Sequence, residues 1–477
     1  MGMRKARPFV NGVWIDDDRE PIPVLGPYKN EQVGVQVTAN KAEVDQALAA
    51  AGSNKKQIAA LSQAFRAKVL YRAAALLEER KEEFANLIAK EVGKALKNTR
   101  DEVARSIETL QLSAEEAKRL FGETIPGGAS ERGASSMALT FRVPVGVVAA
   151  ITPFNAPLNL ICHKIGPSFA AGNVTILKPA PQAPLIAAAL VELLLEAGVP
   201  TQAIHMILGE KEIGEQLVQD DRVNLVSFTG GVPGGRQISK TAGMKKVLLE
   251  LGGNAGTIVH KDANVERAAA ICAKTAFSNS GQSCISVQRI YVHEQILKTF
   301  VAELKERTAA LIVGNPEEER TDVGCVVNRQ TAERIRDWID EAVAEGAELI
   351  HGGNANGASI EPVILLRPRK QSKVVCQEVF GPVVSVLPYR DLDGAIKEVN
   401  ESEFGLQAGI FSNSLEVIRK AAKELEVGGV VVNGSSNFRL DHWPYGGIKN
   451  SGIGREGPRF AAEEMTEMKM VVLQDLL

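Results

Sequence analysis

Cys284 stands in a different setting from the other four cysteines of the chain. It ends a small, polar, glycine-containing run, Asn279-Ser-Gly281-Gln282-Ser283-Cys284. A structural cysteine usually packs among bulky apolar neighbours, whereas a nucleophilic cysteine needs access and a lowered pKa. The run therefore suggests a nucleophile, although such a motif, taken alone, more often surrounds a structural cysteine. The cysteines form an odd, sparse set without a Cys-x-x-Cys pair, which predicts neither a disulfide framework nor a metal site: Cys162, Cys272, Cys284, Cys325 and Cys376.

Two further polar side chains lie at the ends of expected strands. Glu250 follows an apolar run and precedes Gly252-Gly253, and Asn155 follows the apolar run 145–151 between two prolines. The carboxyl edge of a parallel sheet is where α/β enzymes place their sites. A carboxylate there can act as a general base, and a fixed amide can donate to a developing oxyanion. Each of the two residues, taken alone, is more typical of a turn.

A glycine-rich turn is the best candidate for a phosphate contact. The run Phe228-Thr-Gly230-Gly231-Val-Pro-Gly234-Gly235 joins an expected strand to a helix that begins near Arg236. Glycines there let backbone N–H groups and a helix N-terminus approach a pyrophosphate, although an ordinary tight turn fits the run equally well. The G-x-G-x-x-G match at 452–457 has no strand before it and only 20 residues after it, so it predicts no dinucleotide site.

These residues fall in a chain that alternates helices and strands. Residues 41–120 have helical periodicity with Ser62 as an expected N-cap, and a later helix over 185–197 ends at Gly198. A second helix–strand series follows Gly252-Gly253, which predicts a domain boundary there. The pattern predicts an α/β fold with mostly parallel sheets covered on both faces. The expected strands are 145–151, 174–177, 203–208, 225–228, 247–249, 256–259, 289–292, 363–366, 383–387, 408–411 and 429–433.

Composition excludes several other classes of protein. The chain has 477 residues, a formal net charge of −3 and 45% hydrophobic residues, which is typical of a globular protein of about three domains. The balanced charge predicts no nucleic-acid partner. No apolar stretch approaches the length of a membrane span and the N-terminus lacks a signal-peptide core, so we expect no membrane contact and a cytoplasmic location.

Together, the motifs resemble those of the aldehyde dehydrogenase superfamily, in the family's order and over nearly the whole chain. The residues around Cys284 and the run Asn437-Phe-Arg439-Leu-Asp441-His442 look most like the lactaldehyde and phosphonoacetaldehyde dehydrogenase group. The motifs that carry the resemblance are Pro153-Phe-Asn155, Lys178-Pro179, Phe228-Thr-Gly230 with Gly235, Glu250-Leu-Gly252-Gly253, Gly281-Gln282-x-Cys284, Glu378-Val-Phe380-Gly381-Pro382 and Pro444-Tyr-Gly446-Gly447-x-Lys449-x-Ser451-Gly452.

The resemblance implies a fold with three parts. Residues 1–120 and 143–252 would form a Rossmann-like cofactor domain, and residues 253–445 a catalytic α/β domain. Residues 121–142 and 458–477 would pair as a small β extension, with Met470-Val-Val-Leu473 as the C-terminal strand. An exposed strand edge of this kind favours a homodimer or homotetramer.

The resemblance also implies roles for the matching residues. Cys284 would attack an aldehyde, the Asn155 side chain would help to hold the oxyanion, and Glu250 would activate water to release the acid. Lys178 would hold the adenosine ribose and Glu378 the nicotinamide-side ribose of NAD or NADP. The full expected cofactor set is Thr152, Pro153, Phe154, Lys178, Ala180, Pro181, Phe228, Gly230, Gly231, Gly235, Leu251, Glu378 and Phe380.

Two positions depart from the family pattern. Pro181 stands three residues after the lysine, where NAD-selective members typically carry a glutamate that repels a ribose phosphate, so selectivity for NAD is not implied. Gly231 stands where many members have serine, which would loosen the pyrophosphate contact.

The resemblance predicts a short, hydroxylated or anionic aldehyde as the substrate. The expected substrate contacts are Arg105, His163, Ser283 and Arg439, and ion pairs within the protein are an equal alternative for the charged ones. A CoA-acylating semialdehyde dehydrogenase and a non-catalytic protein with this fold remain alternatives. Relatives of the first kind generally lack the glutamate found here as Glu250, and intact Cys284, Glu250 and Asn155 argue against the second.

Overall fold

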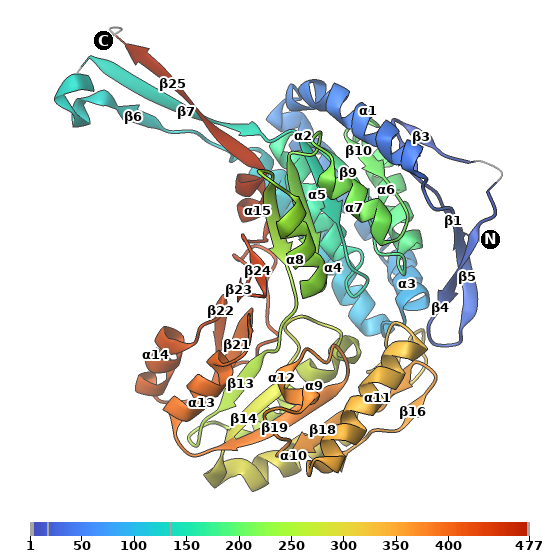
Figure 1. Cartoon of the computed structure of the whole chain (residues 1–477), viewed down its shortest axis with the longest axis vertical. Helices are drawn as coiled ribbons and strands as arrows, with labels where there is room; N and C mark the ends of the chain where they lie inside the picture. Colours follow the sequence, from blue (N-terminus) through green and yellow to red (C-terminus); the bar gives the residue numbers. More distant parts are fainter. Residues whose placement is uncertain (1–3, 17–18, 134, 475–477) are drawn as a thin grey trace.

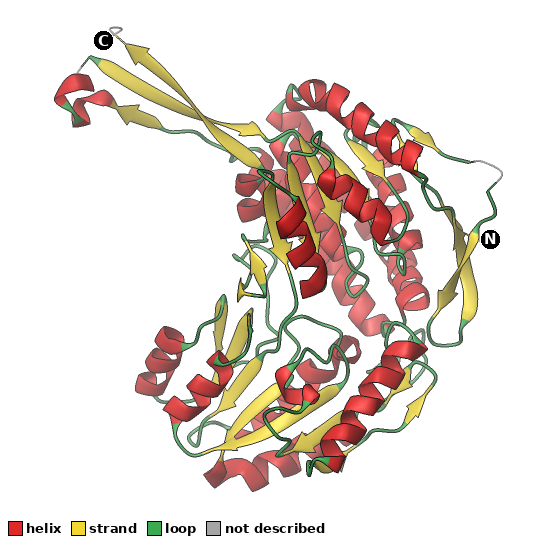
Figure 2. Ribbon diagram, viewed as in Figure 1, coloured by secondary structure: helices red, strands yellow, loops and turns green. Residues whose placement is uncertain are grey.

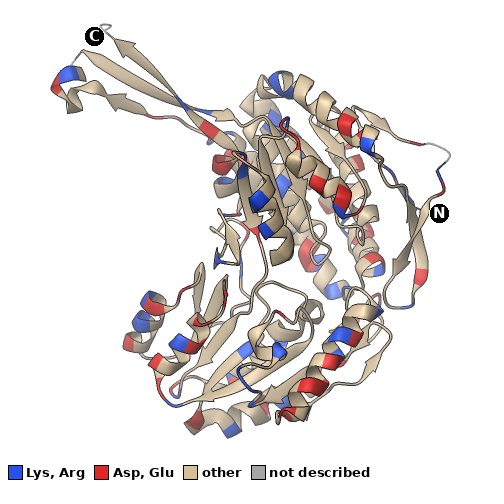
Figure 3. Ribbon diagram, viewed as in Figure 1, with Lys and Arg blue, Asp and Glu red and all other residues tan. Residues whose placement is uncertain are grey.

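A computed structural model of the chain describes residues 4–16, 19–133 and 135–474. The ends of two predicted parts, residues 1–3 and 475–477, lie outside the described residues. Two α/β bodies lie one above the other, and a long β arm projects from the upper one (Figure 1). Basic residues (Lys and Arg) and acidic residues (Asp and Glu) are intermixed over both bodies (Figure 3).

The upper body is built on an eight-stranded sheet. Its five central strands are parallel, and antiparallel strands lie at both edges. Every residue of the strand Val147–Ile151 is buried, because helices cover both faces of a parallel sheet. The strand order is β24 (Gly452–Ile453), β12 (Lys246–Glu250), β11 (Leu225–Thr229), β8 (Val147–Ile151), β9 (Val174–Lys178), β10 (Ile204–Met206), β2 (Phe9–Val10) and β3 (Val13–Trp14).

Nine helices of the described chain belong to this body, and they surround its strands in Figure 2. They are α1 (Lys41–Ala59), α2 (Gln63–Glu79), α3 (Lys81–Val92), α4 (Leu96–Ala117), α5 (Asn159–Ala171), α6 (Pro184–Ala197), α7 (Lys211–Gln219), α8 (Val232–Thr241) and α15 (Pro458–Glu464). A small sheet beside them has the order β1 (Arg4–Ala6), β5 (Glu31–Gln36) and β4 (Ile22–Gly26).

The lower body is built on a seven-stranded sheet, parallel except at the β15 edge. The strand order is β15 (Glu348–His351), β18 (Val363–Leu366), β19 (Val383–Tyr389), β14 (Arg289–His293), β13 (Gly256–Val259), β21 (Gln407–Phe411) and β22 (Gly429–Val432). Its helices are α9 (Val265–Phe277), α10 (Leu297–Ala309), α11 (Arg329–Ala344), α12 (Lys373–Cys376), α13 (Leu392–Asn400) and α14 (Leu415–Glu424). Two small antiparallel pairs accompany it: β16 (Ala355–Asn356) with β17 (Ser359–Ile360), and β20 (Phe404–Gly405) with β23 (Ile448–Lys449).

The arm consists of β6 (Thr124–Pro126), β7 (Ser136–Pro144) and β25 (Thr466–Gln474). β25 pairs antiparallel with β7 from Thr466 opposite Pro144 to Gln474 opposite Ser136. The C-terminal run therefore does lie beside the polar excursion of the sequence, while the role of the arm in oligomerisation stays a prediction.

The predicted α/β class is confirmed, and each predicted strand overlaps an observed one. Ser62 caps α2 through a hydrogen bond to the Phe65 N–H, and Gly198 ends α6 in the left-handed region at φ +102°. The predicted domain limits stay predictions. The edge strand β24 of the upper sheet comes from residues 452–453, which none of the predicted domain limits includes. No helix in the described part of the chain is long and apolar enough to cross a bilayer.

Candidate active site

A cavity of about 730 Å³ lies between the two bodies. Asn155 lines it from the loop after β8, while Ser283 and Cys284 line it from the loop after α9. Arg105 of α4 and Arg439 also line it. The cavity thus brings together five residues that the sequence predicts for catalysis or substrate binding and that come from distant parts of the chain: Arg105, Asn155, Ser283, Cys284 and Arg439.

The cysteine loop is held close to the loop that carries Glu378. Gly281 has φ +71°, and a Cβ there would lie 2.0 Å from the Gly381 carbonyl oxygen, so a side chain would separate the two loops. Cys284 is half-buried, whereas Cys162, Cys272 and Cys325 are buried and Cys376 is exposed. Burial raises the pKa of the Cys284 thiol to about 12, and its Sγ lies 2.9 Å from the Tyr445 hydroxyl.

Asn155 is tied to the same loop by hydrogen bonds. Its side-chain Nδ2 donates to the Gln282 backbone carbonyl at 3.1 Å, and its backbone carbonyl accepts from Asn279 Nδ2 at 2.9 Å. One of the two amide hydrogens is left for another acceptor. The Cys284 backbone N–H makes no backbone hydrogen bond within the described residues. Two N–H donors are therefore available beside the sulfur.

Glu250 ends β12 as a buried carboxylate with 6% exposure. Its Oε2 has no hydrogen-bond partner among the described residues. Burial, followed by the nearby Glu456 carboxylate, raises its pKa well above the ordinary value. A carboxyl group with a raised pKa and a free oxygen is suited to proton transfer.

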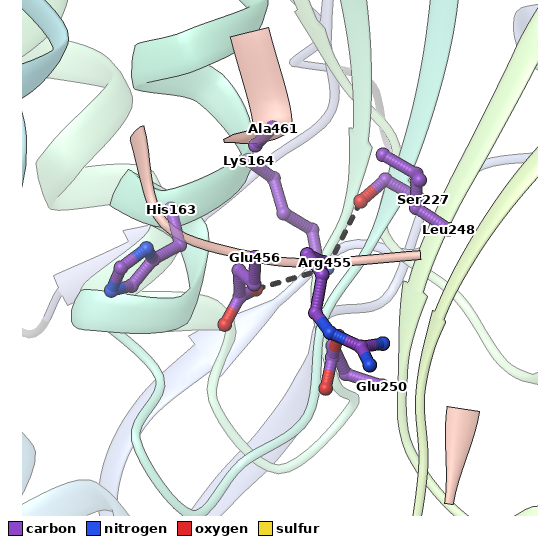
Figure 4. A pocket seen from close by; sticks show the side chains of 8 residues that line it. All are labelled: His163, Lys164, Ser227, Leu248, Glu250, Arg455, Glu456 and Ala461. Atoms are coloured by element: carbon purple, nitrogen blue, oxygen red, sulfur yellow. Dashed lines mark hydrogen bonds and ion pairs between the residues drawn. The ribbon is translucent and has the colours of Figure 1, made fainter. Parts of the chain in front are cut away.

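A small cavity of about 10 Å³ adjoins Glu250, which is room for about one water molecule (Figure 4). Lys164 lines this cavity, and its Nζ lies 3.1 Å from Ser227 Oγ and 3.6 Å from Glu456 Oε1. The residues that line the small cavity are His163, Lys164, Ser227, Leu248, Glu250, Arg455, Glu456 and Ala461.

The glycine-rich turn leads from β11 into a helix, as the sequence predicts, although α8 begins at Val232 and not near Arg236. Gly231 is the N-cap of α8 and supplies no side-chain cap, so the first N–H groups of this helix are available to an anion. A Cβ at Gly235 would lie 2.5 Å from Leu251 Cδ2, and one at Gly230 would lie 2.5 Å from the Phe228 ring. Glycine is therefore required for the backbone to come this close to both side chains.

Other predicted cofactor residues lie at the ends of neighbouring strands. Lys178 ends β9, and burial lowers its pKa to about 8, while the Glu210 and Glu212 carboxylates oppose that shift. Pro181 follows in the next loop, where its carbonyl accepts from Gln36 Nε2 at 3.3 Å, and Ala180 beside it is buried. Thr152, with Pro153 after it, follows β8 directly.

Glu378 and Phe380 approach the upper body from the lower one. Glu378 Oε1 accepts from the Gly253 N–H at 2.9 Å, and burial raises the pKa of this carboxyl to about 7. The Phe380 ring meets the Phe154 ring edge-on, with centroids 6.0 Å apart. The Phe154–Phe380 contact thus joins one predicted cofactor residue of each body, and Glu378 lies close enough to Cys284 to raise the pKa of its thiol.

Two of the predicted substrate residues, Arg105 and His163, form hydrogen bonds with Asp441, a residue that the sequence analysis did not assign. Arg105 donates to Asp441 through Nε at 2.9 Å and Nη2 at 2.6 Å, and His163 Nε2 lies 2.8 Å from Asp441 Oδ1. Arg439 pairs with Glu456 at 2.9 Å. Arg105 and Arg439 still line the cavity, whereas His163 is buried behind it. The alternative of internal ion pairs is therefore observed, and direct substrate contact stays a prediction.

Asp441, Tyr445 and Glu456 are thus site residues that the sequence analysis missed. Asp441 and Tyr445 lie inside runs quoted for the resemblance, and Glu456 inside the discounted G-x-G-x-x-G match. No group of three or more metal-ligating side chains is found among the described residues.

This chain matches known proteins over nearly its full length. The model of the aldehyde dehydrogenase family matches residues 14–471. A 3-sulfolactaldehyde dehydrogenase of Priestia aryabhattai is 48% identical over 98% of this chain and 97% of its own length. A lactaldehyde dehydrogenase of Methanococcus vannielii is 42% identical over 98% of this chain and 100% of its own length.

Among solved structures, the glyceraldehyde-3-phosphate dehydrogenase of Methanocaldococcus jannaschii, complexed with NADP, superposes with a TM-score of 0.93. It is 38% identical and covers 96% of this chain and 100% of its own. The match over nearly the full length in both sequence and structure shows that this chain belongs to the aldehyde dehydrogenase family.

Proposed function

We propose that this enzyme oxidises a short, hydroxylated or anionic aldehyde to its carboxylic acid with NAD(P)⁺, through a covalent adduct on Cys284. The observation that carries the proposal is that Cys284 and Asn155 line the cavity between the two bodies, while the Glu250 carboxylate, which lines the small cavity, lies close enough to raise the pKa of the Cys284 thiol. No other cysteine in the described residues combines partial exposure with such neighbours.

The residues of the upper body fit a dinucleotide. Besides the free N-terminus of α8, the hydroxyls of Thr152 and Thr229 are buried without a hydrogen-bond partner among the described residues, as expected of groups that bind a ligand. Lys178 would bind the adenosine ribose, and Glu378 the other ribose. When bound, NAD(P)⁺ supplies the hydride acceptor for the reaction.

Cys284 and Asn155 would carry the first half of the reaction. The thiolate attacks the carbonyl carbon, forming a C–S bond while the carbonyl electron pair moves to oxygen. The Asn155 side chain and the Cys284 N–H stabilise this oxyanion. Loss of hydride leaves a thioester on Cys284.

Glu250 would carry the second half. Its carboxylate takes a proton from water, which attacks the thioester and releases the acid and the thiolate. The small cavity that Glu250 lines has room for about one water molecule, and the raised pKa of the Glu250 carboxyl suits it to proton transfer.

Cationic residues at the cavity support an anionic substrate. Arg105 makes its two hydrogen bonds to Asp441 through Nε and Nη2, so its Nη1 remains available to donate to a substrate anion. Arg267 and Lys274 line the cavity from α9. The relatives named for sulfolactaldehyde and glyceraldehyde-3-phosphate act on aldehydes with a sulfonate or phosphate, which supports the same class here.

A substrate panel tests the proposal. Reduced nicotinamide is measured with sulfolactaldehyde, lactaldehyde, glyceraldehyde-3-phosphate and propionaldehyde, each with NAD and with NADP. We expect kcat/KM for the best substituted aldehyde to exceed that for propionaldehyde by about tenfold or more, equivalent to about 1.4 kcal/mol. Equal or better use of propionaldehyde would contradict the substrate class, and a requirement for CoA would favour the acylating alternative.

Cofactor preference gives a second prediction. No carboxylate at Pro181 repels a ribose phosphate, so we expect NADP to be used within a factor of about ten to a hundred of NAD, or about 1.4–2.8 kcal/mol. Pro181→Glu should lower kcat/KM with NADP more than with NAD. Wild-type selectivity for NAD beyond about a thousandfold would contradict this, and Glu210 and Glu212 near Lys178 would then be the first candidates for excluding the phosphate.

The exposed apolar residues of the arm support a homodimer or homotetramer, which light scattering tests against the 51.2 kDa of one chain. They include Phe141 of β7 and Met468, Met470 and Val472 of β25.

A further inference from the structure

Tyr445 lies directly over the sulfur of Cys284. The tyrosine is 6% exposed, and its hydroxyl is 2.9 Å from Cys284 Sγ. Its backbone is fixed by a reciprocal pair of hydrogen bonds with Glu456, at 3.0 Å and 2.6 Å. Ile285 and Leu406 pack around the same ring in a small apolar cluster with Cys284. The hydroxyl is therefore held at the sulfur by backbone and packing contacts.

Arg439 lies over the ring of the same tyrosine. Its guanidinium carbon is 3.9 Å from the ring centroid, well within the range of a cation–π contact. Its Nη2 donates to Glu456 Oε2 at 2.9 Å and approaches His163 Nε2 at 3.0 Å, so the guanidinium is anchored on its far side. A cation over the ring withdraws charge from the phenol and makes its O–H a stronger donor.

We propose that Tyr445 is a further catalytic residue, whose hydroxyl donates a hydrogen bond to the Cys284 thiolate, and that Arg439 positions and strengthens this donor. The inference rests on the proposed role of Cys284 as the nucleophile. In the neutral thiol either atom can donate, but a thiolate has no proton, so the direction is then fixed from Oη to Sγ.

The charged groups around Cys284 make such a donor necessary. Burial raises the pKa of the thiol, and the Glu378 and Glu250 carboxylates raise it further, because they disfavour a second negative charge. The Tyr445 hydroxyl and the Arg439 cation act in the opposite direction. Tyr445 keeps its own proton, since burial, followed by Cys284 and Glu250, raises its pKa well above the ordinary value, although the Arg439 cation opposes that shift.

The hydrogen bond would act twice in each turnover. Before attack it favours the thiolate, whose proton has been released to solvent. As the C–S bond forms, the charge moves to the carbonyl oxygen and the hydrogen bond weakens. When water attacks the thioester, the C–S bond breaks, and the same hydroxyl stabilises the leaving thiolate. No proton is transferred from tyrosine in either half.

The test uses Tyr445→Phe, which removes only the hydroxyl and keeps the ring beneath Arg439. The rate of alkylation of Cys284 by iodoacetamide is measured against pH in a Cys376→Ala background, because Cys376 is the other accessible thiol. Loss of a hydrogen bond to a charged group is expected to slow alkylation by about ten- to a hundredfold at every pH below the thiol pKa, neutral pH included.

Tyr389→Phe is the matched control, because its hydroxyl contacts His260 Nδ1 at 2.9 Å away from the cavity, and its profile should equal that of the parent. An unchanged pH profile for Tyr445→Phe would overturn the inference. Binding of NAD(P), followed in the same preparations, shows whether the variant is folded. The assay needs no aldehyde, so failure of the proposed function appears separately, as activity that survives Cys284→Ala.

Discussion

Cys284→Ala is expected to reduce aldehyde oxidation to the detection limit while leaving NAD(P) binding intact. The methyl group cannot form the C–S bond, so neither the hydride-transfer adduct nor the thioester can arise. Loss of the sulfur also removes the contact with the Tyr445 hydroxyl, but the cofactor contacts of the upper body do not depend on it. Steady-state formation of reduced nicotinamide and cofactor titration measure the two properties.

Cys376→Ala serves as the control for this variant, because its thiol is exposed and lies on α12, outside the cavity. It should retain wild-type activity. Substitution of Cys162 or Cys272 can lower stability, since both are buried in cores, but activity per folded molecule should persist. Substantial turnover by Cys284→Ala, or selective loss in Cys376→Ala, would show that the nucleophile lies elsewhere.

Glu250→Gln is expected to slow steady-state turnover by about 10²–10⁴-fold, the range for loss of a general base. Glutamine keeps the size of the side chain but cannot take a proton from water. The first half of the reaction should survive, so rapid mixing should show a burst of reduced cofactor followed by slow release of acid. A variant without a burst, or one with full turnover, would remove Glu250 from the hydrolytic role.

The pH dependence of the second half gives the same residue a further signature. A general base works when deprotonated, so the hydrolysis rate should fall as the pH drops through the Glu250 pKa. Because burial and Glu456 raise that pKa, the fall should come at higher pH than for an ordinary glutamate, and it should vanish in Glu250→Gln. Glu91→Gln is the control: this buried glutamate, with a pKa raised to about 8, contacts α6 and should leave burst and turnover unchanged.

Local patterns in the sequence predicted much of the fold. Ser62 and Gly198 act within one turn of the chain, and the fully buried strands appear as apolar runs, so both could be identified without tertiary information. The strands β1–β5 before residue 41 were not predicted. β2 and β3 have two residues each, too few to show a period, and they form only because β10 offers an edge.

The site was predicted less completely, for a physical reason. The roles proposed for Cys284, Asn155 and Glu250 could be inferred from their residue types and their motifs. By contrast, the contact of His163 with Asp441 joins residues 278 positions apart, and that of Tyr445 with Cys284 joins residues 161 positions apart. No local pattern predicts which cation contacts which carboxylate. The sequence therefore left substrate contact and an internal ion pair as equal alternatives for Arg105 and Arg439, and the fold gives both residues an internal partner.

Direct detection of the acyl-enzyme tests the central claim. Glu250→Gln is mixed with aldehyde and NAD(P)⁺, quenched in acid, and mapped by peptide mass spectrometry. The account predicts that the peptide containing Cys284 gains the mass of the aldehyde less two hydrogens, only when the cofactor is present, and that Cys284→Ala in the same background gains nothing. An acyl group on any other residue, or turnover without acylation of Cys284, would contradict it.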